Sequence, residues 1–185
     1  MRWLQDWRVN TPLQIIAYSE IANEIYDQLR DAPKIIAVPV SNGTLLAGIY
    51  RGFVSLYKRG KTSRVPLMIA SSSTRKNPIV YSFKKGLDHC VDLVPEKIKE
   101  TAVNEPLINW HSFDGEEALY AILQSKGGAY NVSDEKLLKT SKLLKDKEGL
   151  HVLPASVAGL VALLEMDKEK DLEPDRYVAI LTSRK

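Results

Sequence analysis

Short, wholly apolar runs alternate with longer amphipathic segments along this chain of 185 residues. The clearest runs cover residues 35–40, 65–70 and 177–181. A strand without polar residues at alternate positions must be covered on both faces, which is typical of a parallel sheet between layers of helices. The sequence therefore predicts a three-layer α/β fold, with a mainly parallel sheet and helices on both of its faces.

Helices are predicted for the segments between these runs. The first covers residues 11–29, where Thr11 can cap, Pro12 suits the first turn and Gln14 can reach back in a capping box. Its apolar positions 13, 16, 17, 21, 25 and 29 predict the buried stripe. Asp114 and Glu117 predict a second capping box. Further elements are expected as helices at 45–58, 77–86, 114–127, 133–149 and 155–165, and as a strand at 129–132, whereas residues 87–111 show no clear period.

Composition narrows the class of protein. No linker or repeat divides the chain, so residues 1–185 are expected to form a single α/β domain. The net charge of +3 is spread along the chain, which argues against nucleic acid as a partner. A single cysteine, Cys90, favours a reducing compartment, and residues 1–6 lack the apolar core of a signal peptide, so no secretory signal is expected. The most apolar stretch, 152–166, is too short to span a bilayer, so a cytoplasmic protein without membrane contact is predicted.

The first candidate site is the turn Ser41-Asn42-Gly43-Thr44-Leu45, which lies between a predicted buried strand and a helix. Backbone N–H groups at such a turn are unpaired, and the positive end of the helix dipole favours an anion such as phosphate. Gly43 leaves room for close approach, and the hydroxyls of Ser41 and Thr44 are possible further donors. An ordinary strand-to-helix turn uses the same residue types, so both interpretations stay open at this point.

The second candidate is Thr182, at the end of the last predicted strand. Ligands of open α/β sheets bind beyond the carboxyl ends of the strands, where a hydroxyl can hydrogen-bond a ring nitrogen. Threonine also simply ends strands and caps turns, so both interpretations stay open here as well. The histidines are scattered without the spacing of a metal site, and Ser156 has no companion base in the sequence. The residues therefore predict neither a metal ligand nor a catalytic side chain.

Taken in order, these segments resemble the C-terminal half of threonine synthase and other fold-type-II pyridoxal-phosphate enzymes. The most specific matches are residues 38–44 with Gly48 after them, and residues 132–135 continuing through 148–149 to Pro154-Ala155-Ser156. The resemblance implies pyridoxal phosphate as the cofactor. It also implies that Ser41, Asn42, Gly43, Thr44 and Leu45 wrap the cofactor phosphate and that Thr182 donates to the pyridine nitrogen.

The chain also departs from that family. Ser41 stands where relatives often have glycine, which predicts a strained backbone if the position needs a positive φ. Relatives are about twice as long, and their first half carries the lysine that forms the Schiff base. Lys84, in Ser82-Phe83-Lys84-Lys85-Gly86, superficially resembles that lysine motif, but its position in the chain predicts a surface residue.

The leading hypothesis is therefore a fragment or separately encoded half of a threonine-synthase-like lyase of amino-acid biosynthesis. It would retain the phosphate loop, lack the Schiff-base lysine and be inactive without a lysine-bearing partner. Homo-oligomers or a complex with a separate N-terminal half are both expected forms. The alternatives are a non-catalytic small-ligand-binding or oligomerising regulatory domain from the same family, and an unrelated nucleotide-binding α/β module.

Overall fold

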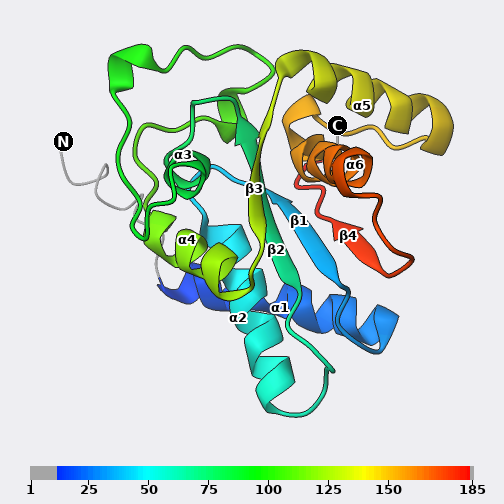
Figure 1. Cartoon of the computed structure of the whole chain (residues 1–185). Helices are drawn as coiled ribbons and strands as arrows, with labels where there is room; N and C mark the ends of the chain where they lie inside the picture. The colour runs from blue at the N-terminus through cyan, green and yellow to red at the C-terminus, as the bar shows by residue number, and fades with distance from the viewer. Residues whose placement is uncertain (1–11, 184–185) are drawn as a thin grey trace.

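Four parallel strands form the central sheet of the computed structural model, which describes residues 12–183 (Figure 1). They are β1 (Ile35–Pro39), β2 (Leu67–Ser73), β3 (Gly128–Val132) and β4 (Tyr177–Ala179). Their order in space is β3-β2-β1-β4, and all three neighbouring pairs are parallel. The predicted parallel sheet is confirmed, and the carboxyl ends of all four strands lie at one edge.

Six α-helices accompany the strands in the described residues. They are α1 (Pro12–Leu29), α2 (Thr44–Lys58), α3 (Pro78–Lys84), α4 (Gly115–Gln124), α5 (Asp134–Glu148) and α6 (Ala158–Lys170). The first of them, α1, precedes β1, and the other five lie in the connections between strands. Short 3₁₀ turns at Pro95–Lys97, Glu105–Leu107 and Pro154–Val157 complete the elements. The segment without a clear sequence period is thus mostly an irregular excursion between α3 and α4.

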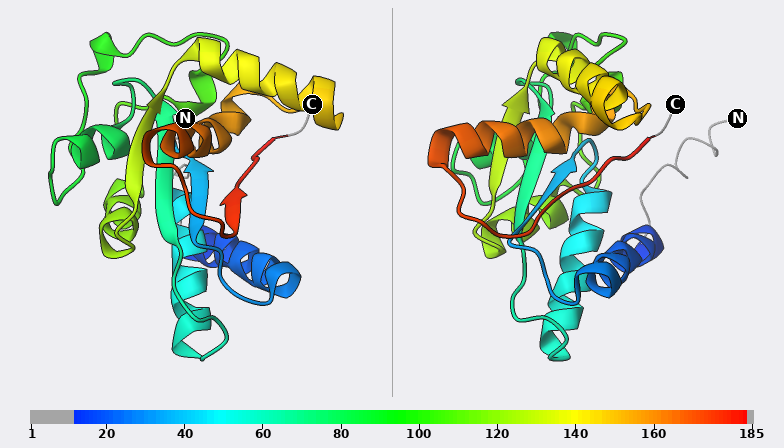
Figure 2. Two further views of the ribbon diagram at one scale, coloured as in Figure 1. Left: turned by 45° about the vertical axis from the view of Figure 1, so that its right-hand side comes forward. Right: turned by 90° about the vertical axis from the view of Figure 1, so that its right-hand side faces the viewer.

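Helices cover both faces of the sheet, as Figure 2 shows. Ile36 and Val38 of β1 point into a core shared with α1, α2, α3 and α4. Ile35 and Ala37, which alternate with them, pack against α6 on the opposite face. Alternate residues of one strand thus enter two different cores, which explains why β1 is apolar at every position. The predicted three-layer architecture is confirmed.

Two glycines of α2 allow α1 to approach unusually closely. A Cβ at Gly48 would lie 2.5 Å from Cβ of Tyr18, and one at Gly52 would lie 2.4 Å from the carbonyl oxygen of Ser19. This contact sets which face of α1 is buried, so Ile15 and Ala22 point inward. The predicted stripe was wrong at its start, because Leu13 is 72% exposed and Ile16 is 58% exposed.

The predicted helix starts had mixed outcomes. The helix predicted at 133–149 is confirmed as α5, which Ser133 caps by accepting from the Lys136 N–H. The predicted capping box of α4 is wrong, because the Asp114 side chain accepts from the Thr44 hydroxyl and Glu117 pairs with Arg51 across to α2. The capping role of Thr11 lies outside the described residues.

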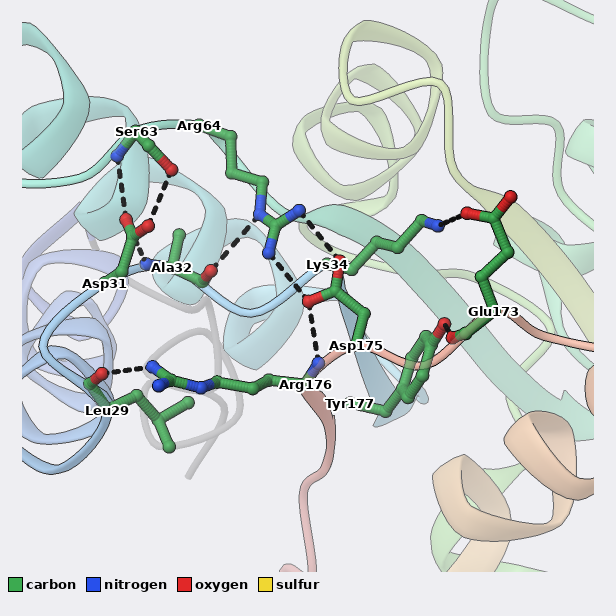
Figure 3. Close-up of polar contacts among 10 residues, drawn as sticks. All are labelled: Leu29, Asp31, Ala32, Lys34, Ser63, Arg64, Glu173, Asp175, Arg176 and Tyr177. Carbon is green, nitrogen blue, oxygen red and sulfur yellow. Dashed lines mark hydrogen bonds and ion pairs between the residues drawn. The ribbon is translucent and has the colours of Figure 1, made fainter.

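A polar network fixes the entry of β4 at the amino edge of the sheet (Figure 3). Arg64 binds both carboxylate oxygens of Asp175, at 2.8 and 3.0 Å, and its Nε donates to the Ala32 carbonyl. Arg176 donates to the Leu29 carbonyl, and Lys34 pairs with Glu173 at 2.9 Å. The start of the last strand is therefore tied to the end of α1 and to the loop before β2.

The described residues include no helix that is both long enough and apolar enough to cross a bilayer.

Gly52→Ala tests the close contact between α1 and α2. The new methyl would also lie 2.6 Å from Cβ of Ala22, so the helices must separate. We expect a loss of about 1–3 kcal/mol in the free energy of unfolding, measured with urea. Ser55→Ala, on the exposed face of the same helix, should change it little. Equal stability of the two variants would contradict the packing described above.

The network around Arg64 should make stability depend on acid pH. The pKa of Asp175 is lowered because Arg64 donates hydrogen bonds to its carboxylate, and the pKa of Asp31 is lowered because Ser63 donates to it. A carboxylate whose pKa is lower in the folded than in the unfolded state stabilises the fold above the unfolded value of about 3.9. This stabilisation is lost as the pH falls through the folded pKa.

Arg64→Gln should therefore be less stable than the natural protein at pH 7, with the difference shrinking towards about pH 3 as Asp175 takes up a proton. Urea unfolding at both pH values measures this. Arg59→Gln is the control, since Arg59 has no carboxylate partner within residues 12–183. A difference for Arg64→Gln that stays constant with pH would show that the ion pair contributes nothing.

Candidate functional site

The turn between β1 and α2 depends on Gly43. Its φ of 95° lies in the left-handed region, which side chains disfavour. A Cβ there would also lie 2.7 Å from Cβ of Ala118 and 2.8 Å from the carbonyl oxygen of Asp114. Both conformation and space therefore require glycine at this position, and α2 begins with the next residue.

Carbonyl groups of the turn are held by the surrounding protein. The Asn77 amide donates to the Ser41 carbonyl at 2.9 Å, and the Ser112 hydroxyl donates to the same oxygen. The Asn42 carbonyl accepts from the Asp114 N–H at 3.0 Å. Within residues 12–183, the N–H groups of Asn42, Gly43 and Leu45 have no acceptor. Donors of the turn therefore remain available to an anion at the start of α2.

Asn77 is a site residue that sequence analysis missed. It is only 1% exposed, and besides holding the turn it caps α3, because its oxygen accepts from the Ile79 and Val80 N–H groups. One side chain thus couples the turn after β1 to the helix after β2. An asparagine before Pro78 is typical of a helix cap, but nothing in the sequence indicated its contact with Ser41.

Two details of the predicted turn need correction. The Thr44 hydroxyl donates to Asp114 at 2.5 Å, and both residues are buried. Its hydrogen is therefore directed at a carboxylate and not at an anion beside the turn. The position of Ser41 does not need a positive φ, since Ser41 is not among the described residues with positive φ, so the strain considered for it does not arise.

Thr182 lies beside the turn because β4 neighbours β1. Ile35 is level with Tyr177 in the parallel register, so continuing that register brings Thr182 level with Val40. The hydrogen bond from the Ile180 N–H to the Ala37 carbonyl shows that the pairing continues beyond the end of β4. The Thr182 hydroxyl has no partner among the described residues and is exposed.

Ser156 holds Thr182 in this position. Its Oγ accepts from the Thr182 N–H at 2.7 Å and from the Ser183 N–H at 3.1 Å, and the residue is 1% exposed. Ser156 itself lies in the 3₁₀ turn before α6. Its further role is to anchor the chain beyond β4, a contact between segments that no local pattern indicates.

All predicted site residues line one pocket of about 290 Å³ at the carboxyl edge of the sheet. Gln14 and Tyr18 of α1 contribute to one side, and Ala155 to another. The complete lining is Gln14, Tyr18, Pro39, Val40, Ser41, Asn42, Gly43, Thr44, Leu45, Leu46, Pro106, Leu107, Ala155 and Thr182. No lysine of the described chain lines it.

Reactive side chains lie elsewhere. Lys84 is exposed on α3 and lines a different pocket, which confirms its prediction as a surface residue. Burial raises the pKa of the Cys90 thiol to about 11, and Glu116 and Asp92 add to the rise. Cys90 is therefore protonated at neutral pH and a poor nucleophile.

Comparison with known proteins agrees with this geometry. A family model described as pyridoxal-phosphate dependent enzyme matches residues 5–183. This chain belongs to that family. The unrelated nucleotide-binding module considered above is thereby excluded.

Among curated proteins, the relatives of this chain include threonine synthases. The enzyme of Methanocaldococcus jannaschii is 31% identical and that of Methanosarcina acetivorans 35% identical, each over 93% of this chain. The chain spans only 42% of the length of either relative.

Solved structures share the fold at lower identity. The fungal L-serine ammonia-lyase from Rhizomucor miehei has a TM-score of 0.76 at 23% identity, covering 95% of this chain and 53% of that one. The processed form of threonine deaminase isoform 2 from Solanum lycopersicum has a TM-score of 0.70 at 17% identity, covering 92% and 46%.

The pocket fits the phosphate and ring of pyridoxal phosphate chemically. The N–H groups of Asn42, Gly43 and Leu45 suit the phosphate, and Gly43 keeps that approach free of a side chain. The Thr182 hydroxyl is a neutral donor for a ring nitrogen. These are the residues that would hold the cofactor in this chain.

Ser156→Ala tests the anchoring of Thr182. Loss of the acceptor frees two N–H groups, so we expect faster hydrogen exchange at Thr182 and Ser183, measured by NMR, with a stability loss of about 1 kcal/mol. Ser125→Ala is the matched control, because its hydroxyl accepts from the Met68 N–H at the start of β2, at the opposite edge of the sheet. Unchanged exchange at Thr182 in Ser156→Ala would refute the anchoring role.

Proposed function

We propose that this chain is a cofactor-binding half of a threonine-synthase-like, pyridoxal-phosphate-dependent lyase of the cytoplasm, and that it is inactive by itself. The observation that carries the proposal is the pocket in which Thr182 meets the N–H groups of the turn after β1, with no lysine from residues 12–183 in its lining. The chain would supply the phosphate and ring contacts of the cofactor. The lysine would come from a segment corresponding to the part of the relatives that this chain does not match.

Each site element has a separate task in this proposal. Ser41, Asn42, Gly43, Thr44 and Leu45 hold the phosphate through backbone N–H groups and the dipole of α2. Thr182 donates to the ring nitrogen without protonating it, which suits elimination and replacement reactions. Bound pyridoxal phosphate serves as an electron sink for chemistry at amino-acid carbons.

An exposed apolar face supports a requirement for a partner. Leu13 and Ile16 of α1 lie opposite the buried Ile15 and Ala22, and both are more than half exposed. Leu181, next to Thr182, is also exposed. Coverage of these side chains by a separate N-terminal half or a second copy of the chain would explain why α1 is apolar on both sides.

The incompleteness of the site can be tested directly. Pyridoxal phosphate is added to the purified chain, reduced with borohydride and located by peptide mapping. We expect no single lysine to be labelled and no turnover of amino-acid substrates. Stoichiometric labelling of one lysine together with turnover would overturn the proposed incompleteness.

Whether the turn binds the phosphate can be tested with two ligands that differ only in the phosphate group. Calorimetry should show tighter binding of pyridoxal phosphate than of pyridoxal, and Gly43→Ala should abolish that preference, because its Cβ would displace the turn. Gly128→Ala is the control, since a Cβ there meets only ordinary contacts from 3.4 Å. Circular dichroism checks that both variants fold.

Thr182→Val keeps the turn intact and should weaken both ligands equally, because each carries the pyridine ring. A phosphate preference that survives in a folded Gly43→Ala variant would show that the turn is not the phosphate site.

A further inference from the structure

A second and larger pocket, of about 620 Å³, lies beside α3. Its walls come from α3, from residues 91–98 of the excursion before α4, and from positions near the carboxyl ends of β2 and β3. Figure 1 shows this excursion as the long green loop that leaves α3 and returns to α4. No residue lines both this pocket and the pocket with Thr182, so the two pockets are separate.

Positive charge predominates in the lining of this second pocket. Arg75, Lys84, Lys85 and Lys97 contribute four cations, and Asp92 is the one carboxylate among them. Asp92 is itself engaged by Nδ1 of His111 at 2.9 Å. None of the four cations forms an ion pair with a described residue. Cations gathered around a concave surface without carboxylate partners produce a field that attracts anions.

Apolar side chains form the rest of the surface. They are Val80, Val91, Leu93, Val94 and Ile98, with the ring of Tyr81 beside them. Val80 is 1% exposed, whereas Val94 is 50% exposed. The Lys84 ammonium lies 5.7 Å from the centre of the Tyr130 ring, and that of Lys85 lies 5.9 Å from the centre of the Tyr81 ring. Lys84 and Lys85 thus lie beside aromatic rings, in a pocket whose remaining lining is largely apolar.

The volume falls in the range of small-molecule sites, which are mostly apolar with a few polar groups that fix orientation. We propose that this pocket binds an amphipathic small-molecule anion, whose apolar body lies on the valines and whose anionic group faces Lys84 and Lys97. The recognised chemistry is a carboxylate, sulfonate or phosphate on a ring or short hydrocarbon body.

A matched pair of probes tests this proposal. Anilinonaphthalene sulfonate carries the predicted anionic group, and phenylnaphthylamine has the same rings without the sulfonate. Titration of the isotope-labelled chain with the sulfonate should shift the backbone amide signals of residues 75–98. We expect the double variant Lys84→Gln with Lys97→Gln to weaken sulfonate binding by about tenfold or more and to leave the neutral probe unchanged.

The control is the double variant Lys139→Gln with Lys142→Gln. These two substitutions at exposed positions of α5 remove the same net charge, but away from the pocket. The control should bind the sulfonate as the natural protein does. The proposal would be overturned if both variants weakened sulfonate binding equally, or if the pocket variant lost the neutral probe as much as the sulfonate. Amide shifts confined to α1 and β4, or no binding of the sulfonate at all, would overturn it too. None of these outcomes depends on whether the chain binds pyridoxal phosphate.

Discussion

The exit of β1 is the constraint on which the site depends. β1 is buried on both faces, and α2 begins only a few residues after it, so the intervening turn must reverse within a crowded space. Gly43 makes this possible through its positive φ and through the room its missing side chain leaves for Ala118. Because Asn77 and Ser112 hold the Ser41 carbonyl, the turn keeps donors such as the Gly43 N–H available to a ligand.

The second half of the site depends on how β4 is held. Its entry is fixed by the ion pair between Arg64 and Asp175, and its exit by the hydroxyl of Ser156. Only three residues form the strand itself, so few hydrogen bonds of the sheet secure it. Contacts at both ends therefore keep Thr182 beside the turn. Through Ser156, the Pro-Ala-Ser segment before α6 supports the pocket that Thr182 lines.

Much of the fold and part of the site could be predicted from local sequence. Apolar runs without alternation indicated a covered parallel sheet, and the turn at Gly43 was placed correctly at the end of a strand. The roles of Asn77, Asp114 and Ser156 could not be predicted, because each bonds to a segment far away along the chain. The prediction for the buried face of α1 was also partly wrong. This helix is apolar on two sides, and close contact with the glycines of α2 decides which side is buried.

The sequence by itself determined the layered α/β fold, the glycine at the turn and the hydroxyl at the end of the last strand. These features follow from residue type and spacing, which act over a few neighbouring positions. Only the tertiary structure decided that Thr182 and the turn share one pocket, because this requires β4 to pair with β1. The tertiary structure also decided that the Thr44 hydroxyl donates a hydrogen bond to Asp114. Both groups are buried where water is excluded, so each needs a hydrogen-bond partner within the protein.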